Sequence, residues 1–166
     1  MIKRIPFFLA LLAMIGGVFI AILFATQEEK FQSKIAAGLE KNEKIQKIVD
    51  PTEKAAKIKS ESEKNWRYYQ RYHFHATGIG AMMIGILLFL ARLEAPKNFV
   101  TIASYMVAIG GFLYPFVWLF AGMYGPEMGR SEAKEAFAIF GYMGGVFLVG
   151  GLLSMILSLK YDMKEA

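Results

Sequence analysis

The chain contains no cysteine among its 166 residues. Structural disulfides, iron–sulfur clusters, thiolate zinc sites and covalently attached c-type haem all need cysteine, so these features are excluded within this chain. The sequence also lacks a recognisable nucleophile constellation, a phosphate-binding loop and a pair of buried carboxylates. We therefore do not expect an enzyme that acts on its own.

Charged side chains are absent from four long apolar runs, which cover residues 5–25, 74–91, 99–124 and 136–159. A helix needs about 20 apolar residues to cross the hydrocarbon core of a bilayer. We therefore predict an all-α membrane protein, a four-transmembrane-helix bundle. Ionisable residues inside the bilayer mark ion pathways and proton relays, so their absence argues against a pump or a coupled transporter.

The predicted transmembrane helices lie near residues 5–25, 73–92, 99–124 and 135–159, and they divide the chain into three parts. Residues 1–25 form an N-terminal transmembrane anchor helix, and residues 26–72 form a polar extramembrane segment. Residues 73–166 form a three-helix transmembrane region with a short C-terminal tail. The apolar core of the first run is longer than the ~7–15 residues of a signal peptide, which favours an uncleaved signal anchor.

The polar segment between the first two runs carries 11 Lys/Arg and 8 Asp/Glu residues. This mixture of signs is not a nucleic-acid-binding patch. Asp50, followed by Pro51 and Glu53, is typical of a helix start, and we predict a helix from there into the second run. The segment is thus predicted to be a helical extramembrane loop, either a solvated spacer or a surface that docks a partner.

Small residues recur at four-residue spacing on all four runs, which lets helix backbones approach closely in a bilayer. The stripes are Ala13, Gly17 and Ala21; Thr77, Ala81 and Gly85; Ala103, Val107 and Gly111; and Gly141 with Gly145. They indicate a tight bundle but leave open whether they face each other or another subunit. Pro115, inside the third run, predicts a kink because proline removes a helix hydrogen bond.

The basic residues give two opposing indications of sidedness. Lys3 and Arg4 favour a cytoplasmic N-terminus, whereas the lysines of the polar segment favour the reverse. The acidic "TQEE" after the first run supports the first arrangement. We predict a multi-pass protein of the inner membrane with both termini in the cytoplasm and residues 26–72 on the outer face.

The two histidines, His73 and His75, lie where the polar segment meets the second apolar run. Residues two apart on a helix point about 200° from each other, so the two imidazoles cannot ligate one ion. His75 shares its face with Gly78, Met82 and Gly85, which leaves room for a b-type haem. We expect His75 to be the better ligand, with His73 and Met82 beside the cofactor.

Two other interpretations of this region stay open. The imidazoles could anchor the helix end within an aromatic belt, or they could hydrogen-bond a quinone head group or a lipid. The residues of the belt would be Trp66, Tyr68, Tyr69 and Tyr72. The residues that could wall a quinone pocket are Tyr114, Pro115 and Trp118. The charged residues expected to be solvated after the third run are Glu127, Arg130, Glu132 and Glu135.

These observations favour a small membrane subunit or accessory protein of a larger inner-membrane complex, most concretely a respiratory or electron-transfer complex. It would contribute to a haem or quinone site near the outer face. Because no other histidine is present, a second haem ligand would come from a methionine, a second copy or another subunit, or the iron would be five-coordinate. The alternative is a stand-alone homo-oligomeric scaffold or channel-like protein without a cofactor. The expected partners are the bilayer and other membrane subunits or itself.

Overall fold

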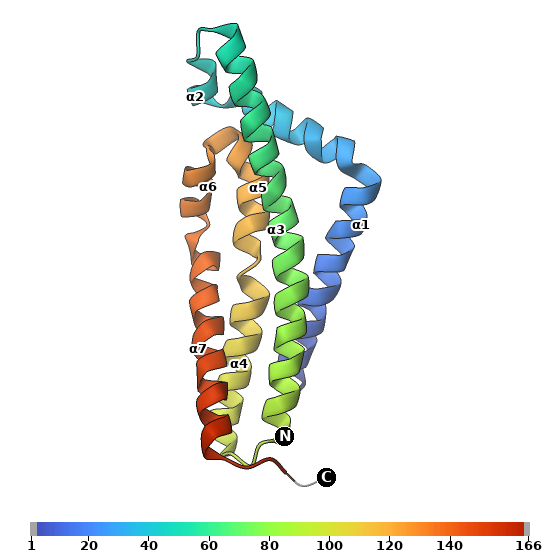
Figure 1. Ribbon diagram of the computed structural model, residues 1–166, viewed down its shortest axis with the longest axis vertical. Coiled ribbons are helices and arrows are strands. Elements are labelled where there is room, and N and C mark those ends of the chain that lie inside the picture. Colours follow the sequence, from blue (N-terminus) through green and yellow to red (C-terminus); the bar gives the residue numbers. More distant parts are fainter. Residues whose placement is uncertain (1–2, 165–166) are drawn as a thin grey trace.

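The computed structural model describes residues 3–164, and this part of the chain is almost entirely helical (Figure 1). The helices are α1 (Arg4–Lys41), α2 (Glu43–Gln46), α3 (Pro51–Arg92), α4 (Lys97–Leu113), α5 (Phe116–Met128), α6 (Arg130–Ala136) and α7 (Ala138–Lys160). Four stretches are long and apolar enough to cross a membrane: α1, α3, the α4–α5 pair and α7. The predicted all-α class and the number of long apolar helices are confirmed.

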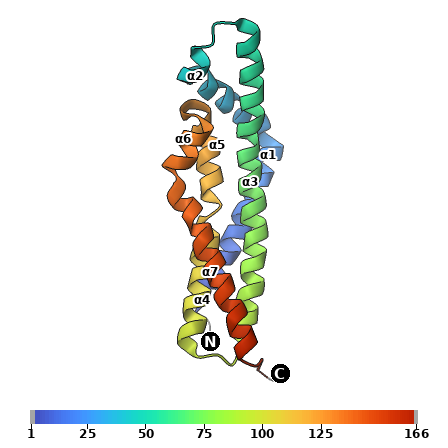
Figure 2. The same cartoon turned by 60° about the vertical axis from the view of Figure 1, so that its left-hand side comes forward.

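Helix α3 runs nearly the whole length of the molecule (Figures 1 and 2), from the end that holds the polar segment through the apolar band to the opposite end. Its start follows the predicted signal: an Asp50 side-chain oxygen accepts hydrogen bonds from the backbone N–H of Thr52 at 2.7 Å and of Glu53 at 2.8 Å. Pro51 occupies the first helical position, where its missing N–H costs nothing. The predicted continuation into the second apolar run is confirmed.

Helix α1 does not end at residue 25 but bends at Gln27, where φ is −137° and ψ is 29°. Its first part lies beside the apolar half of α3, and its second part crosses towards α2 (Figure 1). The second part is held there because Ile35 and Leu39 are buried with Ile45 and Tyr69. The bend thus returns the polar segment to the end of the bundle.

Pro115 breaks the third apolar run into α4 and α5, as predicted. The missing proline N–H cannot complete the helical ladder. The path continues nonetheless, because Tyr114 N–H donates to the Gly110 carbonyl at 3.0 Å and Trp118 N–H to the Pro115 carbonyl at 3.0 Å. The break is therefore a kink within one long rod.

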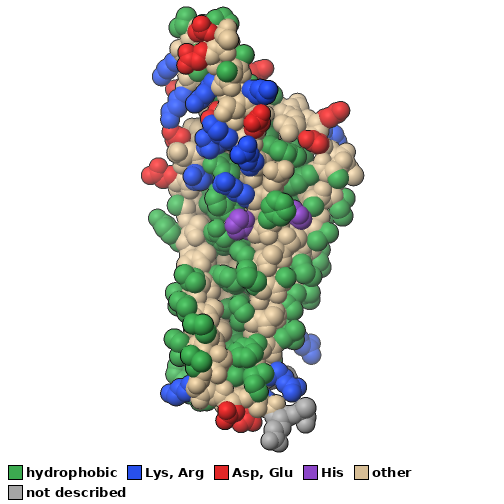
Figure 3. Space-filling view, in the orientation of Figure 1, with side chains coloured by type: hydrophobic (Ala, Val, Ile, Leu, Met, Phe, Trp, Pro, Cys, Tyr) green, Lys and Arg blue, Asp and Glu red, His purple; other side chains and the backbone are tan. Residues whose placement is uncertain are grey.

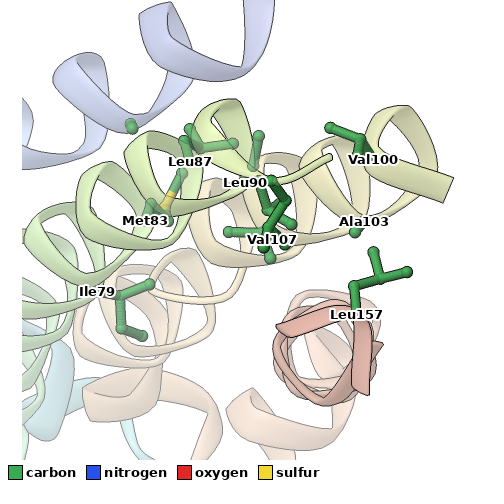
Figure 4. Close-up of a cluster of buried hydrophobic side chains, with 11 residues drawn as sticks. Ile79, Met83, Leu87, Leu90, Val100, Ala103, Val107 and Leu157 are labelled. Atoms are coloured by element: carbon green, nitrogen blue, oxygen red, sulfur yellow. The ribbon is translucent and has the colours of Figure 1, made fainter. Parts of the chain in front are cut away.

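The main core lies in the apolar half, where side chains of α3, α4 and α7 interlock (Figure 4). Met83 and Leu87 of α3 and Val107 of α4 are fully buried, and Leu157 of α7 covers the end of this cluster. Ala10 adds a contact from α1. All the neighbours are apolar, so close packing gives this core its specificity.

The small-residue stripes of the first and third runs face other helices of the bundle. Ala13 and Gly17 of α1 are buried, and a Cβ added to Gly17 would lie 2.8 Å from the Thr77 backbone nitrogen of α3. Ala103 and Val107 of α4 are also fully buried. These stripes build the chain's own interfaces.

Part of the other two stripes faces outward instead. A Cβ added to Gly85 of α3 or to Gly145 of α7 would meet nothing within 4 Å. The close contact of α7 uses glycines outside the predicted pair: a Cβ on Gly150 would lie 2.8 Å from Met106 Cβ and from Val107 N of α4. The periodicity could not predict this register, because α7 is glycine-rich on several faces.

Asn42 joins the polar segment to the rest of the fold. Its side-chain oxygen accepts from the backbone N–H of Lys44 and Ile45 and so caps α2. Its side-chain nitrogen donates to the carbonyls of Pro126 at 3.0 Å and Glu127 at 3.1 Å, which lie in the last turn of α5. One buried amide thus satisfies orphan groups at two helix ends.

Charged side chains gather at the same end (Figure 3), and one of them corrects an expectation from the sequence. Arg130 is not simply solvated: its Nε donates to Glu61 Oε2 at 2.7 Å and ties α6 to α3. Glu132 also pairs with Lys44, although both side chains are exposed. Sequence patterns missed these pairs because their partners lie far apart along the chain.

Burial by itself would raise the pKa of Glu61. The hydrogen bond and positive charge of Arg130, assisted by Lys64, lower the pKa by more than burial raises it, so the net pKa lies below its ordinary value of 4.5. A lowered pKa means that the carboxylate favours the folded state. This contribution is fully present above the ordinary pKa and is lost as pH falls through the lowered one.

We expect Gly110→Ala to lower the free energy of unfolding by about 1–3 kcal/mol, because an added methyl would overpack the α4–α7 contact. The new Cβ would lie 2.8 Å from the Met143 carbonyl oxygen of α7. The matched control, Gly145→Ala, adds the same methyl in open space and should change stability by less than about 0.5 kcal/mol. Thermal unfolding of the purified protein in detergent, followed by circular dichroism, measures both. Equal effects would contradict this packing.

We expect Glu61→Gln to destabilise the protein at pH 7 by about 1 kcal/mol, a modest value because solvent partly screens the pair. The difference from wild type should disappear as the pH is lowered through the depressed pKa of Glu61, since the protonated wild-type carboxyl no longer pairs with Arg130. Glu63→Gln, at an exposed position on the same helix, is the control. A Glu61→Gln penalty that persists at pH 2 would refute the ion pair as its cause.

Candidate functional site

Both histidines lie at the boundary between the charged end and the apolar band of the molecule (Figure 3). Helix α3 is continuous through this region, so residues two apart point to nearly opposite sides. His73 faces α1 and His75 faces the Pro115 region of the α4–α5 rod. The two imidazoles thus face different neighbours on opposite sides of α3, as the helical period predicts.

His73 joins two helices. Its Nδ1 lies 2.8 Å from the Gly17 carbonyl oxygen of α1, and since a carbonyl only accepts, Nδ1 carries the proton and donates. The ring is half-buried. The neighbouring residue on its face, Thr77, packs on the same glycine. His73 is therefore engaged in holding α1 against α3.

His75 is held differently, within its own helix and against aromatic rings. Its Nδ1 donates to the Arg71 carbonyl oxygen at 2.7 Å. Its ring lies edge-on to Tyr114, with centroids 5.4 Å apart, and tilted to Trp118 at 5.8 Å. These contacts fix the ring orientation without using Nε2.

Arg71 belongs to the same cluster, and the sequence analysis did not assign it a role. Its guanidinium lies 4.9 Å from the centre of the Trp118 ring and 5.6 Å from that of Tyr68, which are cation–π distances. It stands one helical turn towards the charged end from His75. The four-residue spacing of Arg71 and His75 in the sequence indicates that they share one face of α3. Only the fold shows that Trp118 of α5 contacts both side chains.

The geometry at His75 fits one axial ligand of a haem. With Nδ1 protonated and bonded to a carbonyl, Nε2 holds the lone pair, and such a bond is the usual support of a metal-ligating histidine. Nε2 has no hydrogen-bond partner within residues 3–164. A Cβ added to Gly78, one turn deeper, would meet nothing within 4 Å. Arg71 offers a positive charge for an acidic substituent on the water side.

Met82 lies on the predicted face but is not an axial partner for His75. Its side chain is 52% exposed, so it projects away from the bundle. Seven residues along one helix separate the two by about 10 Å, whereas the axial ligands of one iron sit on opposite faces of a single ring. That Met82 contacts a cofactor in another way stays a prediction.

The expected aromatic belt is wrong for three tyrosines. Tyr68, Tyr69 and Tyr72 are only 2%, 3% and 9% exposed, so they face the interior instead of forming an outward girdle. Tyr68 packs on Trp118, and the Trp118 indole N–H is buried with no acceptor among the described residues. The sequence places aromatic side chains at this level but does not show which helix covers them.

Tyr114 and Trp118, which were predicted to wall a quinone pocket, do not line the cavity beside α5. Tyr114 and Trp118 contact His75, whereas a cavity of about 450 Å³ lies on another face of α5, lined by residues that include Leu119 and Gly122. Within residues 3–164, no group of three or more His, Cys, Asp or Glu side chains could hold a metal ion. A haem, which needs only an axial ligand from the chain, is not subject to that requirement.

Comparison of the chain with protein-family models, with curated proteins and with solved structures finds no match.

Proposed function

We propose that the chain is a four-transmembrane-helix subunit of a larger inner-membrane electron-transfer complex. In this proposal, the Nε2 atom of His75 binds the iron of a b-type haem near the outer face. The haem would supply one-electron transfer, while the chain supplies a ligand, a cation and an apolar wall.

The observation that carries the proposal is the fixed orientation of the His75 ring, which leaves Nε2 free to bind a ligand. Nδ1 is anchored on the Arg71 carbonyl, the ring is held by Tyr114 and Trp118, and the surface beside Gly78 is open. The positive charge of Arg71 suits a haem propionate at the water side. An imidazole that merely anchored a helix end would not need this combination.

In this proposal, a six-coordinate iron takes its second ligand from another chain, because His73 points to α1 and Met82 lies too far along the same helix. This shortage is the reason to propose a subunit of a complex. The outward-facing glycines, Gly85 and Gly145, would let a partner helix approach closely. A second copy of the chain is the alternative source, and it would make the protein a homo-oligomer whose His75 residues meet at one iron.

The membrane placement is part of the same proposal. The four long helices would cross the bilayer, with the apolar band in the hydrocarbon core and the charged end on the outer face. The first and last described helices, α1 and α7, begin and end at the opposite end of the bundle (Figure 1), as an even number of crossings requires. Lys3 and Arg4 there favour the cytoplasmic side.

We expect His75→Ala to abolish the Soret absorption of the protein purified in its native assembly, because the iron loses its ligand from this chain. His73→Ala should keep the absorption and lower the free energy of unfolding by about 1 kcal/mol, since it removes only the hydrogen bond to Gly17. Absorption spectra and thermal unfolding of the same preparations measure both effects.

The matched controls use neighbouring arginines of α3. Arg71→Gln should weaken haem retention several-fold during dilution, whereas Arg67→Gln, at an exposed position one turn further into the charged end, should not. A wild-type assembly without a cofactor near residue 75 would refute the haem, and so would a Soret band that survives His75→Ala. The size of the complex, by native mass spectrometry, decides between a partner subunit and a second copy.

Reporter fusions test the orientation. A fusion after residue 164 should report the cytoplasm, and a fusion at Glu43, in the polar segment, should report the outer side. The reverse pattern would place His75 at the cytoplasmic face and would overturn the proposed sidedness, but not the proposed ligand.

A further inference from the structure

A cavity of about 450 Å³ lies in the bend of α1 and is separate from the His75 site. Ile20 lines it from the part of α1 before the bend, and Ile35 and Gly38 line it from the part after. Gly38 packs so closely on α5 that an added Cβ would lie 2.6 Å from Pro126 Cβ. The bend and α5 therefore flank a partly open space of the size that binds small ligands.

The lining of the cavity combines apolar and charged side chains. Ile20 of α1 and Leu119 and Met123 of α5 are apolar lining residues. Lys34 and Lys41 also line the cavity, and because they are seven residues apart they share one face of α1. Glu127 is the acidic residue of the lining. A ligand that fits this lining has an apolar tail and an anionic head.

Tyr69 of α3 adds a polar group to the lining. Its side chain is only 3% exposed, and its ring is held by Phe31 at a centroid distance of 5.1 Å. Its hydroxyl makes no hydrogen bond to another residue within 3–164, and burial raises its pKa to about 12, so the hydroxyl stays protonated. Because Tyr69 lines the cavity, this hydroxyl is available to donate a hydrogen bond to an acceptor on a ligand.

We propose that this cavity binds an anionic phospholipid of the adjoining leaflet. The phosphate lies between Lys34 and Lys41, an ester carbonyl accepts the hydrogen bond of the Tyr69 hydroxyl, and the acyl chains leave along Ile20 and Met123. A quinone has a similar tail but no charge, so it would gain nothing from the two lysines. The proposal uses the membrane placement above and is independent of the haem.

The test is native mass spectrometry of the delipidated full-length protein, titrated with phosphatidylglycerol, phosphatidylcholine or a short-chain quinone. We expect phosphatidylglycerol to bind at least about fivefold more tightly than phosphatidylcholine. Lys34→Gln with Lys41→Gln should remove this preference. The control, Lys47→Gln with Lys59→Gln, makes the same change in net charge at positions outside the cavity and should leave the preference intact.

Tyr69→Phe keeps the ring and its packing but removes the hydroxyl, so it should weaken phosphatidylglycerol binding several-fold without changing thermal stability in the delipidated state. The proposal is overturned if the two lipids bind equally, if the control pair has the same effect as Lys34 and Lys41, or if the quinone displaces phosphatidylglycerol. None of these outcomes depends on a Soret band or on the topology reporters, so each proposal can fail separately.

Discussion

The close contact of α1 with α3 at Gly17 fixes which face of α3 meets α1, and thereby which side chains of α3 face α5. Because Gly17 has no Cβ, Ala76 and Thr77 reach the α1 backbone, and His73 donates a hydrogen bond to the Gly17 carbonyl. Once His73 is turned to α1, the helical period turns His75 away from it, towards Tyr114 and α5. In a bilayer, where apolar burial does not drive helices together, such close packing and hydrogen bonding determine which faces meet.

Two faces of helix α5 border the two candidate binding sites. Trp118 lies on the face that meets Arg71 and His75, and Leu119 and Gly122 lie on the face that lines the cavity in the bend of α1. The break at Pro115 separates this part from α4, which packs in the apolar core. The proposed haem ligand and the proposed lipid site therefore flank one short helix without sharing a side chain.

The polar segment is part of the fold instead of a free spacer. Ile35 and Leu39 form a second core with Tyr69, and Asn42 binds the last carbonyls of α5. The ion pair of Glu61 with Arg130 joins α3 to α6. Its inner face is thus occupied by contacts with the rest of the chain, which holds the bend of α1 over the cavity and keeps Lys34 and Lys41 beside it.

The sequence by itself determined the elements: four long apolar helices, the start of α3 at Asp50 and the kink at Pro115. These follow from local rules, namely the length of apolar runs, capping side chains and the missing proline N–H. It also determined that His73 and His75 face opposite sides, because the helical period requires it. Only the tertiary structure decided which glycines are buried, that the tyrosines face inward, and that Arg71 and Trp118 accompany His75. Those features depend on which face of each helix meets another, and residues distant along the chain jointly set that choice.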